Sequence, residues 1–169
     1  MAERIYGFPP VARADARLLI LGSMPSVESL RQSFYYAHPR NAFWPMMAEI
    51  LGEARPETVE DKRALLTRHR IALWDTVESC ERAGSLDSAI RSARANDFAA
   101  LYARCPEIRF VFFNGGTAEQ LYRRLVARED GARSFLRLPS TSPAYTLRYG
   151  EKKAVWERAL KEALMDEPL

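Results

Sequence analysis

Four short apolar runs, each followed by a turn of glycine and polar residues, constrain the fold of this 169-residue chain more than any other feature. Runs of this length are typical of buried strands, and segments with helical periodicity separate them. This alternation predicts an α/β fold with a parallel sheet covered on both faces. Because the carboxyl ends of parallel strands meet at one edge, we expect all four turns to line one ligand crevice. The runs are residues 15–21, 71–74, 108–113 and 134–138, and their turns are GSMPS, DT, NGG and LPSTSP.

The segments between these runs carry helix signals. Asn41 is expected to cap a helix that starts at Ala42, and Asn96 is expected to cap another. Thr58 with Asp61 forms an acidic variant of the capping box. The expected helices are residues 26–32, 42–51, 58–69 and 96–104, a helix from 117 that Gly131 ends, and a final helix from 150 with Val155, Trp156, Ala159, Leu160 and Ala163 on its inner face.

Two segments are expected to lack strands. Residues 1–14 are predicted to be an arm, because Pro9 and Pro10 cannot continue a helix. Residues 78–94 contain charges, glycine and serine, and are predicted to be a loop with one helical piece near residues 85–92. The sequence has no internal repeat, low-complexity stretch or linker, so residues 1–169 are predicted to form a single domain.

The composition is that of a soluble globular protein, with 47% apolar and 28% charged residues. No apolar run approaches the roughly 20 residues of a membrane helix, and acid and proline stand near the N-terminus where a signal peptide would be apolar. We therefore expect a cytoplasmic monomer without membrane contact. Two cysteines without CxxC spacing and two distant histidines predict no metal site and no cofactor.

The distribution of charge is more informative than the net charge of +3. Residues 133–158 contain six basic side chains against two acidic ones. This bias favours a surface for nucleic-acid phosphates, although chance clustering on a solvated surface explains it equally well.

The segment from residue 18 to 44 holds the residues with the clearest chemical meaning. Tyr35, Tyr36, His38, Arg40 and Asn41 are too polar and too close together for an ordinary core, and they would suit a pocket for a flat polar ring. An aromatic base can stack on such rings while an amide pairs with its edge. The alternative for the two tyrosines is a core or lid pair.

The other turns also have plain structural explanations. Asn114 precedes glycine and could serve only as a turn residue, and Asp75 could be a cap or one half of an ion pair. The LPSTSP turn could be no more than a rigid connection, yet its hydroxyl and amide groups would suit phosphate contacts. Phosphate-loop, dinucleotide and nucleophile-elbow patterns are absent, and a nucleophilic Ser23 or Ser140 would need His38 as its base.

Taken together, the motifs LILGSMPS, YYAHPRNAFWP, LWDTV, FFNGG and LPSTSPAY resemble the uracil-DNA glycosylase superfamily, and most closely its hypoxanthine-DNA (deoxyinosine) glycosylase branch. The resemblance covers residues 18–145, in the expected order. It implies a three-layer α/β/α fold around a central four-stranded parallel sheet. It also implies a base-excision repair enzyme that acts on damaged DNA, flips out a deaminated base and hydrolyses its N-glycosidic bond, with hypoxanthine preferred.

The resemblance also assigns roles to residues. Other branches have an acidic or amide residue two positions after the first glycine, whereas this chain has Met24, so the catalytic role moves to Asn41 and Asn114. The residues implied in base binding are Gly22, Ser23, Met24, Tyr35, Tyr36, His38 and Asp75. Those implied in DNA binding are Pro25, Ser26, Ser140, Thr141, Ser142, Tyr145 and Arg148.

The motif segments contain no lysine to act as an amine nucleophile, so we expect a monofunctional glycosylase. Two alternatives stay open. One is a glycosylase that acts mainly on uracil or xanthine. The other, which Met24 favours, is a lesion-binding or nucleotide-binding module without catalysis.

Overall fold

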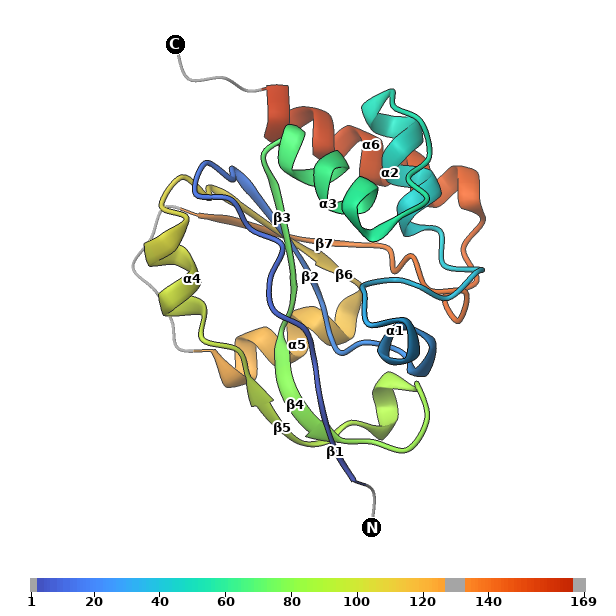
Figure 1. Cartoon of the computed structure of the whole chain (residues 1–169), viewed down its shortest axis with the longest axis vertical. Coiled ribbons are helices and arrows are strands. Elements are labelled where there is room, and N and C mark those ends of the chain that lie inside the picture. The colour runs from blue at the N-terminus through green and yellow to red at the C-terminus, as the bar shows by residue number, and fades with distance from the viewer. Residues whose placement is uncertain (1–2, 127–132, 166–169) are drawn as a thin grey trace.

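Four parallel strands form the central sheet, in the order β3-β2-β6-β7 (Figure 1). The computed structural model describes residues 3–126 and 133–165, so Gly131, expected to end a helix, lies outside the described residues. The predicted parallel sheet is confirmed, although β2 begins later than expected. The strands are β2 (Leu18–Gly22), β3 (Ile71–Asp75), β6 (Phe110–Asn114) and β7 (Ser134–Leu138).

Helices cover both faces of this sheet, which confirms the three-layer α/β/α arrangement (Figure 1). On one face lie α2, α3 and α6. On the other face lie α5 and α4. The Phe98 ring of α4 contacts Trp74 of β3 and Tyr122 of α5, and the ring centroids are 5.1 Å apart in each pair. The helices are α1 (Val27–Gln32), α2 (Phe43–Leu51), α3 (Val59–Arg68), α4 (Phe98–Arg104), α5 (Gly116–Leu125) and α6 (Tyr149–Met165).

The core explains why the first apolar run is unbroken. Residues 18–21 are fully buried, since helices cover both faces of β2 and neither face needs polar side chains. On α6, the expected inner residues are buried except Val155, which is 44% exposed. Successive residues of a helix are about 100° apart around its axis, so Val155 lies next to the buried face that contains Trp156 and not on it.

A second sheet, antiparallel and in the order β1-β4-β5, shows that both expectations of strand-free segments are wrong. It consists of β1 (Arg4–Tyr6), β4 (Val77–Glu81) and β5 (Arg91–Ala95), and a short 3-10 helix (Asp87–Ala89) lies between β4 and β5. The prolines of the expected arm exclude a helix but permit extended pairing at an edge. Register shifts between β4 and β5 disturb the alternation of side chains, so the charges of this segment resembled those of a loop.

The capping residues of α2 and α4 each lie one residue after the predicted ones, while the capping box of α3 is confirmed. Helix α2 begins at Phe43 after Ala42, and the side chain of Asn41 accepts a hydrogen bond from the Phe43 N–H. Helix α4 is capped by Asp97 and not by Asn96. Asparagine and aspartate are both good caps, so two adjacent candidates cannot be separated by sequence.

The strand register places polar residues at one edge of the central sheet. Gly22 at the end of β2 pairs with Asp75 at the end of β3, and Asn114 at the end of β6 pairs with Leu138 at the end of β7. The turns that follow these strands therefore start from the same edge.

Candidate functional site

A pocket of about 460 Å³ lies at this edge of the sheet. Its walls contain every residue to which the family resemblance assigned a role, except His38 and Arg148, and Arg40 of the predicted ring pocket does not line it. The walls also contain Gly115 and Gly116 of the predicted NGG turn, and Ser29, residues 85–88, Thr117 and Ala144, which sequence reasoning missed. The volume is in the range of small-molecule sites and is sufficient for a nucleobase.

Asn41 has an amide group with a defined orientation. Its Oδ1 accepts a hydrogen bond of 2.9 Å from the Phe43 N–H, which follows from its place just before α2. Its backbone is also tied down, since the Asn41 N–H donates to the His38 carbonyl and the Ala42 N–H donates to the Thr141 carbonyl. Among the described residues, no acceptor takes the two N–H groups of the Asn41 side chain. A ligand in the pocket would therefore meet Asn41 as a hydrogen-bond donor.

Asn114 uses both ends of its amide on one neighbour. Its Nδ2 donates to Thr141 Oγ1 at 3.0 Å, and its Oδ1 accepts from the Thr141 N–H at 2.9 Å. Thr141 is fully buried. The pair fastens the turn after β7 to the end of β6, so Thr141 is a structural residue of the pocket and has no surface to offer to a phosphate.

Asp75 has a buried carboxyl group, one oxygen of which has no hydrogen-bond partner among residues 3–126 and 133–165. Only 3% of the residue is exposed, and its Oδ2 is buried and accepts no hydrogen bond. Burial raises the pKa of Asp75 to about 7; the negative charge of Asp87 adds to the rise and Arg82 opposes it. The side chain of Asn96 donates to the Asp75 backbone carbonyl at 2.7 Å and leaves the carboxyl group free.

Tyr36 places a second unpartnered oxygen beside this carboxyl. Its φ angle of 52° lies in the left-handed region, which is uncommon for a bulky residue and is frequent at functional sites. The hydroxyl is buried and has no hydrogen-bond partner among the described residues. Burial raises the pKa of Tyr36, Asp75 adds to the rise, and the neighbouring amide of Asn114 partly opposes it. The phenol is therefore neutral at physiological pH.

Gly22 allows these two groups to come close to the backbone. A Cβ at this position would lie 2.5 Å from Asp75 Oδ1 and 2.8 Å from the Tyr36 hydroxyl. Any larger residue would displace one or both. The glycine of the first turn is thus required by the close approach of the pocket's two acidic groups.

Two other predicted base-binding residues mainly support the pocket from behind. Tyr35 is 2% exposed, its hydroxyl donates to the Pro9 carbonyl, and its ring packs edge-on against Phe8 and Phe34. The side chain of Met24 is buried in a small cluster under the second sheet. Tyr35 is therefore largely a core aromatic, which was the alternative that the sequence left open for the two tyrosines.

Two predicted residues lie outside this pocket. The His38 ring accepts a hydrogen bond from the Arg40 N–H at 3.1 Å and so stabilises its own turn. Arg148 lies further along the chain at the start of α6, where it lines a separate hollow. The structure gives neither of them a direct approach to the enclosed pocket.

Comparisons with known proteins agree with this geometry. The model of the uracil DNA glycosylase superfamily matches residues 9–164. The chain belongs to this superfamily. A hypoxanthine DNA glycosylase of Methanosarcina acetivorans is 36% identical over 92% of this chain and 97% of its own, and one of Methanosarcina barkeri is 33% identical with the same coverage.

A solution structure determined by NMR also matches. It belongs to a protein of M. acetivorans described as a candidate uracil DNA glycosylase, with a TM-score of 0.79 and 34% identity over 95% of this chain and 99% of that one. The protein is thus a DNA glycosylase, an enzyme that hydrolyses N-glycosidic bonds, and DNA is its substrate. Within residues 3–126 and 133–165, no helix is long and apolar enough to cross a membrane.

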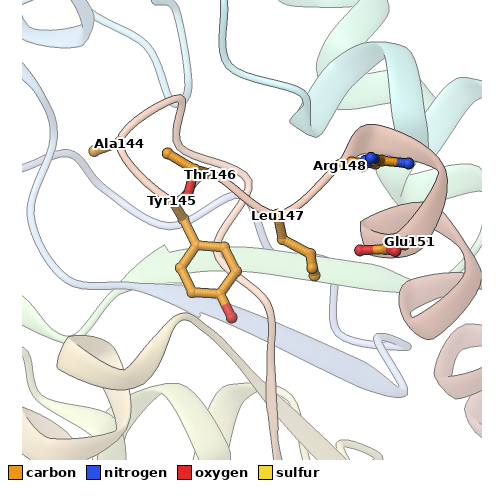
Figure 2. Close-up of a pocket in the computed structure, with 6 residues that line it drawn as sticks. All are labelled: Ala144, Tyr145, Thr146, Leu147, Arg148 and Glu151. Carbon is orange, nitrogen blue, oxygen red and sulfur yellow. The ribbon is translucent and has the colours of Figure 1, made fainter.

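In this glycosylase a wider hollow of about 550 Å³ adjoins the pocket and shares Ala144 and Tyr145 with it. Figure 2 shows Tyr145 and Leu147 on the same side of the loop, with Arg148 and Glu151 near the start of α6. Tyr145 is 47% exposed, and no enclosed polar group faces a ligand here. The hollow is therefore more open than the pocket at the ends of the strands.

Two side chains of α6 hold the chain segment that leads into the loop of Figure 2. Lys152 Nζ donates to the Ser142 carbonyl at 3.1 Å and lies 5.4 Å from the centre of the Tyr145 ring. Trp156 Nε1 donates to the Pro139 carbonyl at 2.8 Å. Burial lowers the pKa of Lys152, but its carbonyl partner is best satisfied by the charged form. Sequence reasoning missed both supports because their partners lie far away in the chain.

Lys152→Met is expected to weaken binding to lesion-containing duplex DNA by about tenfold, since a hydrogen bond from a charged donor contributes about 1.5–3 kcal/mol. Methionine keeps a long unbranched side chain but removes the bond to Ser142 and the positive charge over the Tyr145 ring. Fluorescence anisotropy measures the Kd. The matched control is Lys153→Met, which removes the same charge from a side chain paired with Glu49, and an equal loss in both variants would contradict a role in holding the loop.

The segment 85–88 forms the opposite wall of the glycosylase pocket. Ser23 Oγ donates to Asp87 at 2.7 Å, and the Val27 N–H donates to Ser85 Oγ at 2.8 Å. The tip residue, Leu86, is 64% exposed. The sequence predicted a loop with one helical piece near residues 85–92, and the 3-10 helix Asp87–Ala89 lies there. Nothing in the sequence placed this segment beside the first turn.

Proposed function

We propose that the protein is a monofunctional glycosylase that releases hypoxanthine from deoxyinosine in DNA. The observation that carries the proposal is the free amide N–H pair of Asn41 at an enclosed pocket. Two relatives named as hypoxanthine DNA glycosylases, 36% and 33% identical over nearly the whole chain, support the choice of base. The described pocket lining contains no lysine, which supports hydrolysis without an amine intermediate.

The chemistry requires stabilisation of two opposite charges. As the N9–C1′ bond breaks, its electron pair moves onto the base and positive charge develops on the sugar. Asn41 would donate a hydrogen bond to the departing anion, where preorganised donors have their largest effect. Water adds to C1′, and one of its protons ends on the base or in solvent. The DNA phosphates lie near the sugar and favour its positive charge.

The remaining residues divide between base and backbone. Gly22, Tyr36 and Asp75 would enclose the base, with Ser23 and Met24 in the turn that frames it and Tyr35 behind. Asn114 would keep the turn of residues 139–143 in place, through Thr141. Contacts with the DNA backbone and the gap in the duplex are proposed for Pro25, Ser26, Ser140, Ser142, Tyr145 and Arg148.

Duplex oligonucleotides with a single deoxyinosine, deoxyuridine or deoxyxanthosine test the choice of base. We expect abasic product from all substrates that fit the pocket, with the highest single-turnover rate for deoxyinosine. Absence of hypoxanthine release would contradict the proposal. Faster release of uracil or xanthine would make that base, and not hypoxanthine, the preferred one. Tight binding to inosine-containing DNA without abasic product would support a binding module without catalysis.

A further inference from the structure

We propose that Asp75 acts as a neutral carboxylic acid that pairs with the lactam edge of the flipped base, so that base recognition is lost when this group ionises. The inference rests on the proposed function, because it requires a deaminated base as the ligand. It adds a protonation requirement and a named specificity residue to that function.

The geometry gives Asp75 a place to bind and no partner of its own. It lines the pocket, and its Oδ2 is buried without a hydrogen-bond donor in the described protein. The other carboxyl oxygen of Asp75, Oδ1, and the Tyr36 hydroxyl both lie close to Gly22, so the carboxyl group and the phenol converge on one small region. A buried polar group without a partner is costly, and a ligand that pairs with it recovers that cost on binding.

Among the described residues none forms an ion pair with Asp75, although the positive charge of Arg82 is near enough to lower its pKa. Arg82, just after β4, directs its Nε to the Gly84 carbonyl and its Nη2 to the Pro25 carbonyl. Asp87, in the 3-10 helix, accepts from Ser23 and keeps its negative charge near Asp75. Tyr35 and Tyr36, before α2, are both neutral because burial raises their pKa values. Burial, to which the negative charge of Asp87 adds, raises the pKa of Asp75 to about 7 against the opposing charge of Arg82.

A neutral carboxyl group matches a lactam, whereas a carboxylate does not. Its O–H can donate to the base carbonyl while its C=O accepts from the adjacent N–H. Hypoxanthine, xanthine and uracil all present this pair of groups. An ionised Asp75 has only acceptors and would repel the carbonyl oxygen. Base binding should therefore weaken as pH rises through the pKa of Asp75.

Tyr36 distinguishes a deaminated base from its parent. Its neutral hydroxyl adds a second donor beside Asp75, and a carbonyl oxygen can accept from both. The amino group that adenine or cytosine carries at this position has no lone pair free to accept either bond. Two donors that converge on one oxygen thus favour the product of deamination.

The opposite role for Asp75 predicts the opposite pH dependence. A general base that activates water must be ionised, so its activity would rise with pH through the same range. The amide of asparagine can replace a neutral acid as donor and acceptor, but it cannot act as a base. The sign of the pH dependence and the activity of Asp75→Asn therefore separate the two roles.

The test is the pH profile of single-turnover kcat/KM on a deoxyinosine duplex between about pH 5.5 and 8.5. For the unmodified enzyme we expect a fall that starts near the pKa of Asp75 and approaches about tenfold per pH unit. Asp75→Asn should stay within a few-fold of the unmodified enzyme at low pH and lose this fall, and Asp75→Ala should be weak throughout. A rise in activity with pH, together with an inactive Asp75→Asn, would overturn the proposal.

Two further variants sharpen the assignment. Asp87→Asn keeps an acceptor for Ser23 and removes a negative charge near Asp75, so the fall should move to lower pH. Asp15→Asn, at an exposed ion pair with Arg13, should keep the profile of the unmodified enzyme. If Asp87→Asn leaves the position of the fall unchanged, the titrating group is not Asp75.

The result can be separated from that of the proposed function. If uracil or xanthine is released and hypoxanthine is not, the proposed base preference fails, and the same pH series on the base released tests Asp75. If hypoxanthine is released at a rate that does not fall with pH, the base preference stands and the role of Asp75 fails.

Discussion

Asn41→Ala is expected to lower single-turnover kcat/KM on a deoxyinosine duplex by about 10²–10³-fold, the usual effect of losing one preorganised donor at a developing anion. The structure supports this size of effect because Asn41 Oδ1 is held by the Phe43 N–H and its N–H groups are left for the ligand. Binding to a duplex with an abasic site should change little, since the departing base is absent. Gel-based cleavage and anisotropy measure the two quantities.

Two variants test the direction of the Asn41 amide. Asn41→Asp keeps an oxygen for the Phe43 N–H and replaces the donors with a second acceptor, so it should be as inactive as Asn41→Ala. An active Asn41→Asp would show that this residue acts as an acceptor, for example toward water. His38→Ala alters the same segment outside the pocket and should keep most of the activity.

The central sheet could be predicted from sequence because helices cover both of its faces. Strands β2 and β3 are buried along their whole length, so their apolar runs have no other stable location in a soluble fold. The second sheet could not be predicted in the same way. Strand β1 has only three residues, β5 is largely exposed, and the register shifts between β4 and β5 remove the alternation of apolar and polar residues. Their pairing depends on contacts made far along the chain.

The site was predictable where a topological rule applied. Gly22, Asp75 and Asn114 each end a parallel strand, and that fact alone brings them to one edge. Hydrogen-bond partners were not predictable in the same way. The bonds between Asn114 and Thr141, and the fully enclosed position of Tyr35, depend on side-chain packing that no local pattern specifies.

Asn114→Ala is expected to lower kcat/KM by about 10²-fold, because a displacement of about 1 Å in a catalytic site can cost that much. The substitution removes both bonds that fasten Thr141 to the end of β6. The backbone carbonyl of Thr141 in turn accepts from the Ala42 N–H, next to Asn41. Loosening this turn should therefore misplace the proposed catalytic amide as well as the DNA-binding serines. Single-turnover rates on the deoxyinosine duplex measure the loss.

A double-mutant cycle with Thr141 tests whether this fastening is the cause. Thr141→Val removes the hydroxyl bond but keeps the Thr141 N–H bond to Asn114, so it should reduce activity less than Asn114→Ala. In the Asn114→Ala background the same substitution should have almost no further effect, because its partner is already gone. Thr141→Ser keeps both bonds and serves as the matched control. If the losses from Asn114→Ala and Thr141→Val instead multiply, Asn114 must act on the base directly and the turn is held by other contacts.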